Sequence, residues 1–300
     1  MSETRVLTPF ATGGCYFECP RWHDGRWWAA DFYRHGVFTY GADGSEELVL
    51  EVEAQPSGLG WLPDGDLLVV SMKDRRVLRR AADGSVTVHA DVSALTGGHL
   101  NDMVVDRAGR AYAGNFGFDL MGGGHPATAA IVRIDPDGSA AIAAEDLWFP
   151  NGTVIADDGT LIVAETFGAR FTAFSIQPDG SLADRRVWAQ IDPTPEAADV
   201  ATMLGGVTFA PDGCALDAEG CLWAANALGG PLTRFAPGGE VVDELAIPDG
   251  LAAFACGLGG EDGRTLMVCA APDFHEEARS AAREGVLLRT TVEVPHAGLP

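Results

Sequence analysis

The stretch of sequence that decides the fold runs from Trp148 to Thr166 and reads WFPNGTVIADDGTLIVAET. It contains two short apolar runs, Thr153 to Ala156 and Thr160 to Ala164, which are rich in β-branched residues and are separated by Asp-Asp-Gly. Such runs on either side of a glycine-bearing turn predict two strands joined by a tight hairpin. A polar amide, Asn151, stands where the chain enters the first strand.

The same arrangement recurs along the chain. In each copy an apolar strand precedes a Gly-bearing hairpin and a second strand follows it, and further hairpin signals such as Asp43-Gly44 and Asp179-Gly180 come after several copies. Each unit therefore holds about four strands in roughly 40 to 60 residues, the period of a propeller blade. The copies are found near Trp22, Gly58, Met103, Thr153, Cys214 and Ala253.

Six such units predict an all-β fold, a six-bladed β-propeller that takes in residues 1–300 as one domain. A β-sandwich is the alternative, but six evenly spaced units are too many for one pair of sheets. The last unit has a third strand at Val286 to Val294 and ends before a fourth. We expect the otherwise unplaced strand at Arg5 to Phe10 to supply the missing edge and to close the ring.

Composition limits the classes of function. The 300 residues are 47% hydrophobic and 21% charged, as in a globular protein with a substantial core. Residues 1–14 lack a basic start followed by an apolar run, and no window holds about 18 uninterrupted apolar residues, so we expect a cytoplasmic protein that does not enter membranes. The net charge of −23 argues against nucleic acid as a partner and favours divalent cations.

The six cysteines show neither a Cys-x-x-Cys pair nor zinc-finger spacing with histidine. We expect them to be reduced residues that serve packing. They are Cys15, Cys19, Cys214, Cys221, Cys256 and Cys269.

Candidate site residues follow from the topology of a blade. The innermost strand starts at one face of the ring and the second strand returns to that face, so the start of the first strand and the loop after the second lie together. Four of the six starts carry a side-chain oxygen at a common position, and two carboxylates and two amides converging there would form a hard site suited to calcium, magnesium or manganese. These residues are Glu18, Asn101, Asn151 and Asp212.

Each of these residues also has a simpler interpretation when it is taken alone. Pro-Asn-Gly at Asn151 and Pro-Asp-Gly at Asp212 are common turn sequences. Asn101 beside Asp102 could cap a loop, and Glu18 could be a solvated charge. Their shared position in four copies of one repeat favours the metal site.

Several longer motifs contain these residues: Glu18-Cys-Pro-Arg-Trp, Asn101-Asp-Met-Val-Val-Asp, Pro150-Asn-Gly and Pro211-Asp-Gly-Cys-Ala-Leu-Asp. Together they resemble the family of senescence marker protein, gluconolactonase and luciferin-regenerating enzyme over essentially the whole chain. The resemblance implies a six-bladed propeller with an axial divalent metal held by Glu18, Asn151 and Asp212, and with Asn101 beside the metal as a substrate ligand. It also implies hydrolysis of sugar lactones or related esters. The more distant diisopropyl fluorophosphatase has a similar quartet, so phosphotriester hydrolysis is an alternative.

We therefore expect one divalent cation, Ca²⁺ in the first place, with Zn²⁺, Mn²⁺ and Mg²⁺ as alternatives. The expected reaction is the opening of a lactone by metal-activated water, and Asp212 is the candidate general base because the two amides cannot accept a proton. The partner would be a small lactone or ester, and the protein a monomer or weak homo-oligomer. A non-catalytic propeller, for example a strictosidine synthase-like fold, is a further alternative, but buried carboxylates would not be expected in an unused site.

The residues predicted to bind substrate differ from those of the family that the chain resembles. At the position of His99, the animal gluconolactonases that this chain resembles have an arginine, which helps to bind sugar hydroxyls. D-gluconolactone is therefore expected to be a poorer substrate than less hydroxylated lactones. Asn115 and Asp119 follow the second strand of the third unit and are further candidates for substrate binding. Two insertions on this face, Asp119 to Ala130 and Ile191 to Thr208, could act as lids or as inert loops.

Residues 273–285 predict a short helix. Asp273 is the expected N-cap, Glu276 would complete a capping box, and Gly285 would follow the last turn. Close to this helix, His275 could either overhang the pocket or lie on the surface.

Overall fold

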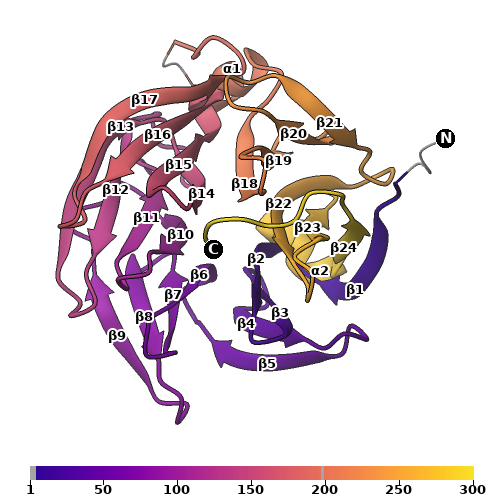
Figure 1. The fold of residues 1–300 in the computed structure, drawn as a ribbon, viewed down its shortest axis with the longest axis horizontal. Coiled ribbons are helices and arrows are strands. Elements are labelled where there is room, and N and C mark those ends of the chain that lie inside the picture. Colours follow the sequence, from indigo (N-terminus) through magenta and orange to yellow (C-terminus); the bar gives the residue numbers. More distant parts are fainter. Residues whose placement is uncertain (1–4, 197–198) are drawn as a thin grey trace.

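A computed structural model describes residues 5–196 and 199–300, and in that part of the chain six four-stranded antiparallel sheets surround a central axis (Figure 1). The predicted six-bladed β-propeller is confirmed. Five blades run in chain order from the axis outward. Their strands are β2 (Phe17–His23), β3 (Arg26–Asp31), β4 (Gly36–Tyr40) and β5 (Glu46–Glu51); β6 (Pro56–Trp61), β7 (Leu67–Ser71), β8 (Arg76–Arg80) and β9 (Val86–Asp91); β10 (Leu100–Val105), β11 (Ala111–Asn115), β12 (Ala129–Ile134) and β13 (Ala140–Leu147); β14 (Pro150–Ile155), β15 (Thr160–Glu165), β16 (Arg170–Ile176) and β17 (Leu182–Gln190); β18 (Pro211–Leu216), β19 (Leu222–Asn226), β20 (Leu232–Phe235) and β21 (Val241–Leu245).

The sixth blade joins the two ends of the chain. Its strands from the axis outward are β22 (Ala252–Gly259), β23 (Thr265–Ala271), β24 (Gly285–Thr291) and β1 (Thr8–Gly14). The N-terminal strand thus closes the ring as predicted, but it begins at Thr8, which pairs with Arg289 of β24, and not at Arg5. Arg5 instead forms an ion pair with Asp243 on β21 of the neighbouring blade.

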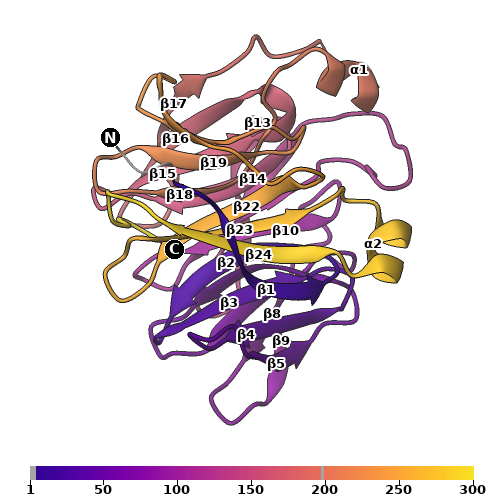
Figure 2. The same ribbon diagram turned by 90° about the vertical axis from the view of Figure 1, so that its right-hand side faces the viewer.

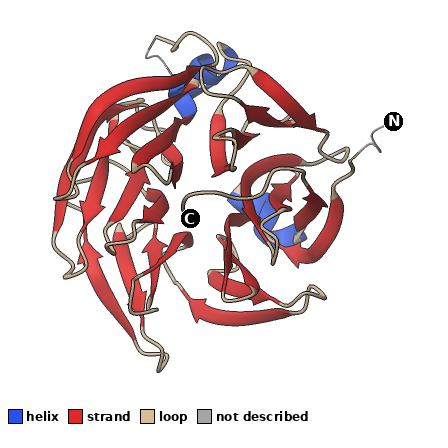
Figure 3. Cartoon of the chain, in the orientation of Figure 1, coloured by secondary structure: helices blue, strands red, loops and turns tan. Residues whose placement is uncertain are grey.

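Two α-helices occur among the described residues, α1 (Val200–Gly205) and α2 (Glu276–Ala282), together with the 3₁₀-helix η1 (Thr166–Gly168). Figures 2 and 3 show both α-helices outside the blades, and in the side view they lie on the same face of the ring. Neither is long and apolar enough to cross a membrane.

The cap predicted for α2 is wrong. The N-cap residue is His275, whereas Asp273 lies further upstream, where its Oδ1 accepts a hydrogen bond of 2.9 Å from the His275 backbone N–H. Asp273 also pairs with Arg279, at 3.1 Å, and so holds the start of the helix from outside. The helix ends at Ala282, and Gly285 is already the first residue of β24.

Glu276 does not complete a capping box. It instead accepts hydrogen bonds from Gln55 Nε2, at 3.1 Å, and from Lys73 Nζ, at 3.2 Å. Both partners belong to the blade of β6–β9 or to the loop before it. This glutamate therefore ties α2 across the ring's face to another blade.

The face opposite the helices is covered by the C-terminal tail. In Figure 1 the C terminus lies at the centre of the ring. Leu299 forms an isolated antiparallel bridge with Ile155 of β14, with two backbone hydrogen bonds of 2.8 Å, and His296 bridges to Asp217 in the next blade. The tail therefore crosses the axis, which leaves the other face for a cavity.

Apolar side chains fill the space between neighbouring blades. Phe171 of β16 and Phe235 of β20, from adjacent blades, have ring centroids 5.9 Å apart, and Phe209 packs edge-on against Phe235 at 5.1 Å. All six cysteines are buried with free thiols, as expected.

The innermost strands approach one another so closely that some positions exclude a Cβ atom. A Cβ built on Gly152 of β14 would lie 2.4 Å from the backbone oxygen of Asp212, and one on Gly213 of β18 would lie 2.5 Å from the Cβ of Ala255. The turn interpretation of Pro-Asn-Gly and Pro-Asp-Gly is therefore wrong. Both motifs lie within inner strands, and their glycines are required by contact with the next blade.

Asp217 shapes the β18–β19 hairpin and also binds a neighbouring strand. Its Oδ1 accepts hydrogen bonds from the backbone of Glu219, at 2.9 Å, and of Cys221, at 3.1 Å. Its Oδ2 pairs with Arg234 Nε at 2.7 Å. The Asp217 side chain is fully buried, so its loss should cost more than the weakened turn alone would.

Gly152→Ala should destabilise the protein by about 1–3 kcal/mol, because the new methyl group overlaps backbone atoms of β18. Gly205→Ala is the matched control, since a Cβ there meets no atom within 4 Å. Urea denaturation of both variants measures the difference. Equal stability of the two variants would contradict the close approach of β14 and β18.

Candidate active site

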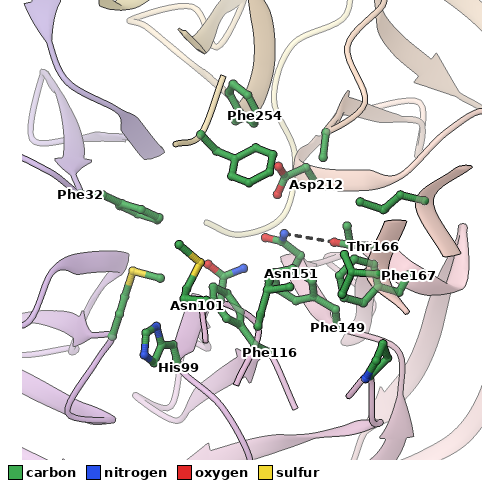
Figure 4. Close-up of a pocket in the computed structure, with 18 of the residues that line it drawn as sticks. Phe32, His99, Asn101, Phe116, Phe149, Asn151, Thr166, Phe167, Asp212 and Phe254 are labelled. Carbon is green, nitrogen blue, oxygen red and sulfur yellow. Dashed lines mark hydrogen bonds between the residues drawn. The ribbon is translucent and has the colours of Figure 1, made fainter. Parts of the chain in front are cut away.

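A cavity of about 740 Å³ opens at the axis on the face that carries α1 and α2. The four predicted oxygen residues all line it, and Figure 4 shows three of them, Asn101, Asn151 and Asp212, around its floor. They come from four innermost strands, with Glu18 on β2, Asn101 on β10, Asn151 on β14 and Asp212 on β18. All four are buried.

A shared irregularity of the inner strands directs these side chains toward the axis. In β10, Leu100 pairs with Asn115 and Met103 pairs with Ala113, so that one extra residue bulges between the two pairs. The same interruption lies between Pro150 and Thr153 of β14 and between Pro211 and Cys214 of β18, and Glu18 is the last regularly paired residue before the interruption in β2. A β-bulge re-aims the side chains next to it. The common position seen in the sequence is therefore a common bulge.

The amide of Asn151 has a fixed orientation. Its Nδ2 donates a hydrogen bond of 3.2 Å to Thr166 Oγ1, drawn as a dashed line in Figure 4, and Thr166 in turn donates to the backbone oxygen of Pro211 at 2.8 Å. The amide nitrogen is thereby engaged. The side-chain oxygen of Asn151 is left as an acceptor or ligand toward the cavity.

In the amide of Asn101 it is the oxygen, and not the nitrogen, that is hydrogen-bonded to a neighbouring side chain. Its Oδ1 accepts a hydrogen bond of 3.4 Å from Ser57 Oγ. Ser57 occupies the corresponding place on β6, so one blade's hydroxyl orients the next blade's amide. The amide N–H groups of Asn101 then remain as donors, which suits contact with a substrate oxygen better than contact with a cation.

Both carboxyl groups of the site have a raised pKa. Burial raises the pKa of Glu18 well above its usual range, and the nearby Asp212 and Asp102 carboxylates add to this rise. Burial, together with Asp102, raises the pKa of Asp212 to about 8, while a hydrogen bond from the Asn151 amide opposes the rise. Two ionised carboxylates in this cavity would therefore be costly without a nearby positive charge.

The part of the chain that the structure describes places no such charge in the cavity lining. Arg21 is buried beneath the site, but its guanidinium is held by Asp102 at 2.7 Å. Among the described residues that line the cavity there is no lysine or arginine. Two carboxylates and a free amide oxygen, all hard donors, fit a divalent cation of the calcium or magnesium type.

His99 lines the cavity as expected for a substrate contact. Burial lowers its pKa, and the nearby Lys73 ammonium lowers it further. The ring lies 5.6 Å from the ring of Phe116, measured between centroids. The lowered pKa favours the neutral imidazole, which lacks the charge of an arginine.

Asn115 and Asp119, the other two residues predicted to bind substrate, do not line the cavity. Asn115 is fully buried and used by its own loop: its Nδ2 donates to Ala130 O at 2.7 Å and its Oδ1 accepts from Gly117 N at 2.9 Å. Asp119 is exposed and its Oδ1 accepts from Gly122 N at 2.9 Å.

Asn115 belongs to a ring of buried polar residues at the ends of the second strands. Asp31 accepts from the backbone of Cys15 and Tyr16, Glu165 from that of Trp148, and Asn226 from that of Ala210. In these three blades the residue fixes the segment that leads into the inner strand, whereas Asn115 bonds within its own loop. The members of this ring are Asp31, Asn115, Glu165 and Asn226.

The aromatic wall of the cavity was not predicted. Most of its members lie in the predicted strand starts and loops, so a count of aromatic residues in those segments would have found them. Both insertions contribute to the wall, through Leu120, Met121 and Pro126 in the first and through Val200 and Leu204 in the second, and His275 lies at the mouth. The aromatic members are Tyr16, Phe32, Tyr33, Phe116, Phe149, Phe167, Phe254 and Phe274.

Fold and cavity together define a six-bladed propeller with a buried, oxygen-rich acidic site on its axis. The family model described as the SMP-30/Gluconolactonase/LRE-like region matches residues 17–272. The chain therefore belongs to this family, as its motifs indicated.

Individual relatives agree with this placement. A 6-deoxy-6-sulfogluconolactonase of Pseudomonas putida is 29% identical over 206 residues, which cover 67% of this chain and 64% of that protein. A pentonolactonase of Haloferax volcanii is 25% identical over 278 residues, 90% of this chain and 86% of its own length. Among solved structures, a calcium-binding regucalcin of Agrobacterium tumefaciens has a TM-score of 0.76 at 22% identity, over 99% of this chain and 96% of the other, which supports the fold.

The buried carboxyls predict how stability depends on pH in the metal-free protein. Because folding raises the pKa of Asp212 to about 8, the folded state keeps a proton that the unfolded chain loses near pH 4. The free energy of unfolding should therefore decrease as the pH rises from about 4 to about 8. Urea denaturation in a chelator at several pH values measures this slope.

In the variant Asp212→Asn the free energy of unfolding should depend less on pH, although Glu18 still contributes part of the dependence. Asp157→Asn is the control, since Asp157 is exposed and pairs with the exposed Arg107. An unchanged slope in Asp212→Asn would show that this carboxyl is not protonated in the folded protein.

Proposed function

We propose that this protein is a divalent-metal-dependent lactonase that opens a cyclic ester by hydrolysis. The observation that carries the proposal is the set of two buried carboxylates and a free amide oxygen in one cavity, without a lysine or arginine among its described lining residues. The relatives named as sugar lactonases support the reaction class.

Glu18, Asn151 and Asp212 would hold the cation. We propose Ca²⁺, because every donor is an oxygen, and because a structural relative is described as a calcium-binding protein. A cation bound there would polarise the lactone carbonyl and acidify a water molecule. The neighbouring amide of Asn101, held by Ser57, is placed to donate to the carbonyl or ring oxygen of the lactone.

Asp212 is the residue that we assign as general base. It would take a proton from the attacking water, because the amides of Asn101 and Asn151 cannot accept one. Its carboxyl group is buried beside the amide of Asn151. The apolar walls limit the access of bulk water, which strengthens each of these polar contacts.

Asp212→Asn should lower lactone turnover by roughly two to four orders of magnitude, because the variant lacks both the base and one charged ligand. Treatment of the wild-type protein with a chelator should abolish turnover, and added Ca²⁺ should restore it. Elemental analysis of the purified protein, with a lactone panel and a phosphotriester before and after chelation, measures both effects.

Asp217→Asn is the matched control five residues away. It lies outside the cavity, so turnover should stay near that of the wild type, while the melting temperature falls through loss of the pair with Arg234. Near-normal turnover of Asp212→Asn, or full turnover in chelator, would refute the proposal. Turnover of the phosphotriester in preference to every lactone would assign the site to the alternative reaction.

A further inference from the structure

The wall above the oxygen site is aromatic on two sides. On one side Tyr16 lies 4.9 Å from Phe254 and 5.2 Å from Phe32, between ring centroids. On the other, Phe149 lies 4.6 Å from Phe116 and 5.2 Å from Phe167. Figure 4 shows Phe32 and Phe254 across the cavity from Phe116, Phe149 and Phe167. A molecule at the oxygen site is therefore placed between two aromatic groups.

Most polar side chains in this wall already have partners within the protein. The Tyr33 hydroxyl donates to the backbone oxygen of Phe274, and the Gln55 amide donates to Glu276 at 3.1 Å. The Thr166 hydroxyl donates to Pro211 O at 2.8 Å. In the second insertion Asp199 accepts from the Thr202 backbone at 2.8 Å. These groups are occupied in holding the cavity's own loops.

A sugar lactone carries a hydroxyl on nearly every ring carbon. Each hydroxyl that enters the cavity gives up its bonds to water, and a group left without a new partner opposes binding. Besides these partnered groups and the four oxygen residues at the floor, the polar side chains of the lining are the Tyr16 hydroxyl and three histidine rings, His99, His125 and His275, and the His99 ring lies against Phe116. An apolar substituent, in contrast, would gain from contact with the aromatic rings.

The mouth of the cavity is apolar as well. Met121 and Phe274 lie there on loops from two different blades, and they are 51% and 45% exposed, respectively. The volume of about 740 Å³ exceeds what a bare lactone ring needs and falls within the range of about 300–1,000 Å³ found for drug-sized ligands. A substrate with an extended apolar part would cover both exposed side chains.

Building on the lactonase proposed above, we infer that the substrate is a lactone with an alkyl or aryl substituent and not a polyhydroxylated sugar lactone. The ring ester lies at Glu18, Asn101, Asn151 and Asp212, and the substituent extends between the aromatic groups toward Phe274.

Three lactones of equal ring size test this inference: D-glucono-δ-lactone, δ-valerolactone and δ-decalactone, each in the presence of Ca²⁺. The expected order of kcat/KM is δ-decalactone first, then δ-valerolactone, then D-glucono-δ-lactone. The alkyl lactone should exceed each of the others by about tenfold or more, since apolar contacts in a pocket have effects of this size. A kcat/KM for D-glucono-δ-lactone equal to or above that of δ-decalactone would overturn the inference and leave the lactonase intact.

Phe274→Ala locates the substituent. The ratio of kcat/KM for δ-decalactone to that for δ-valerolactone should fall about threefold or more. Because Phe274 is half exposed and only its backbone oxygen bonds to Tyr33, the variant should fold normally, as a melting curve will confirm. Val88→Ala, on the exposed face of β9, is the matched control and should leave the ratio unchanged. An unchanged ratio in Phe274→Ala would contradict the placement.

Binding without turnover separates the two proposals. A six-membered lactam with a pentyl chain and D-gluconolactam, neither of which is readily hydrolysed, are compared by the shift in melting temperature that each produces. A larger shift with the pentyl lactam supports the apolar preference, even if no lactone is hydrolysed and the lactonase proposal fails. A larger shift with D-gluconolactam refutes the apolar preference.

Discussion

The close approach of the innermost strands at the axis is the constraint on which the rest of the structure depends. Gly152 and Gly213 allow each inner strand to lie against the next without a Cβ atom between them. The bulges beside these glycines aim Asn151 and Asp212 at the axis. A ring closed this tightly brings side chains from distant parts of the sequence into one small cavity.

The same constraint concentrates negative charge. Glu18 and Asp212 are buried near the Asp102 carboxylate, and the buried guanidinium of Arg21 is paired with Asp102. Such an arrangement should lower the stability of the metal-free protein as the pH rises from about 4 to about 8. A site that opposes folding in this way is typical of residues kept for binding or chemistry.

The polar residues of this face form two rings with different roles, and these roles explain which candidates line the cavity. Side chains at the bulged starts of the inner strands, such as Asn101, face the cavity. Those at the ends of the second strands, such as Asn115 and Glu165, bond to the loop backbone. The two rings lie in neighbouring positions on the same face, which is why both classes looked alike as candidates.

The sequence by itself determined the number of blades, the closing role of the N-terminal strand and the four oxygen residues, because hairpin turns and alternating strands are local patterns that repeat. Only the tertiary structure decided that the glycines after Asn151 and Asp212 are contact residues and not turn residues, since the atoms that exclude a Cβ belong to the next blade. It also decided that Asn115 serves its own loop, that Glu276 reaches Gln55 across the ring, and that aromatic rings from several blades form one wall. Such contacts join residues far apart in the chain, and no local pattern records which of them meet.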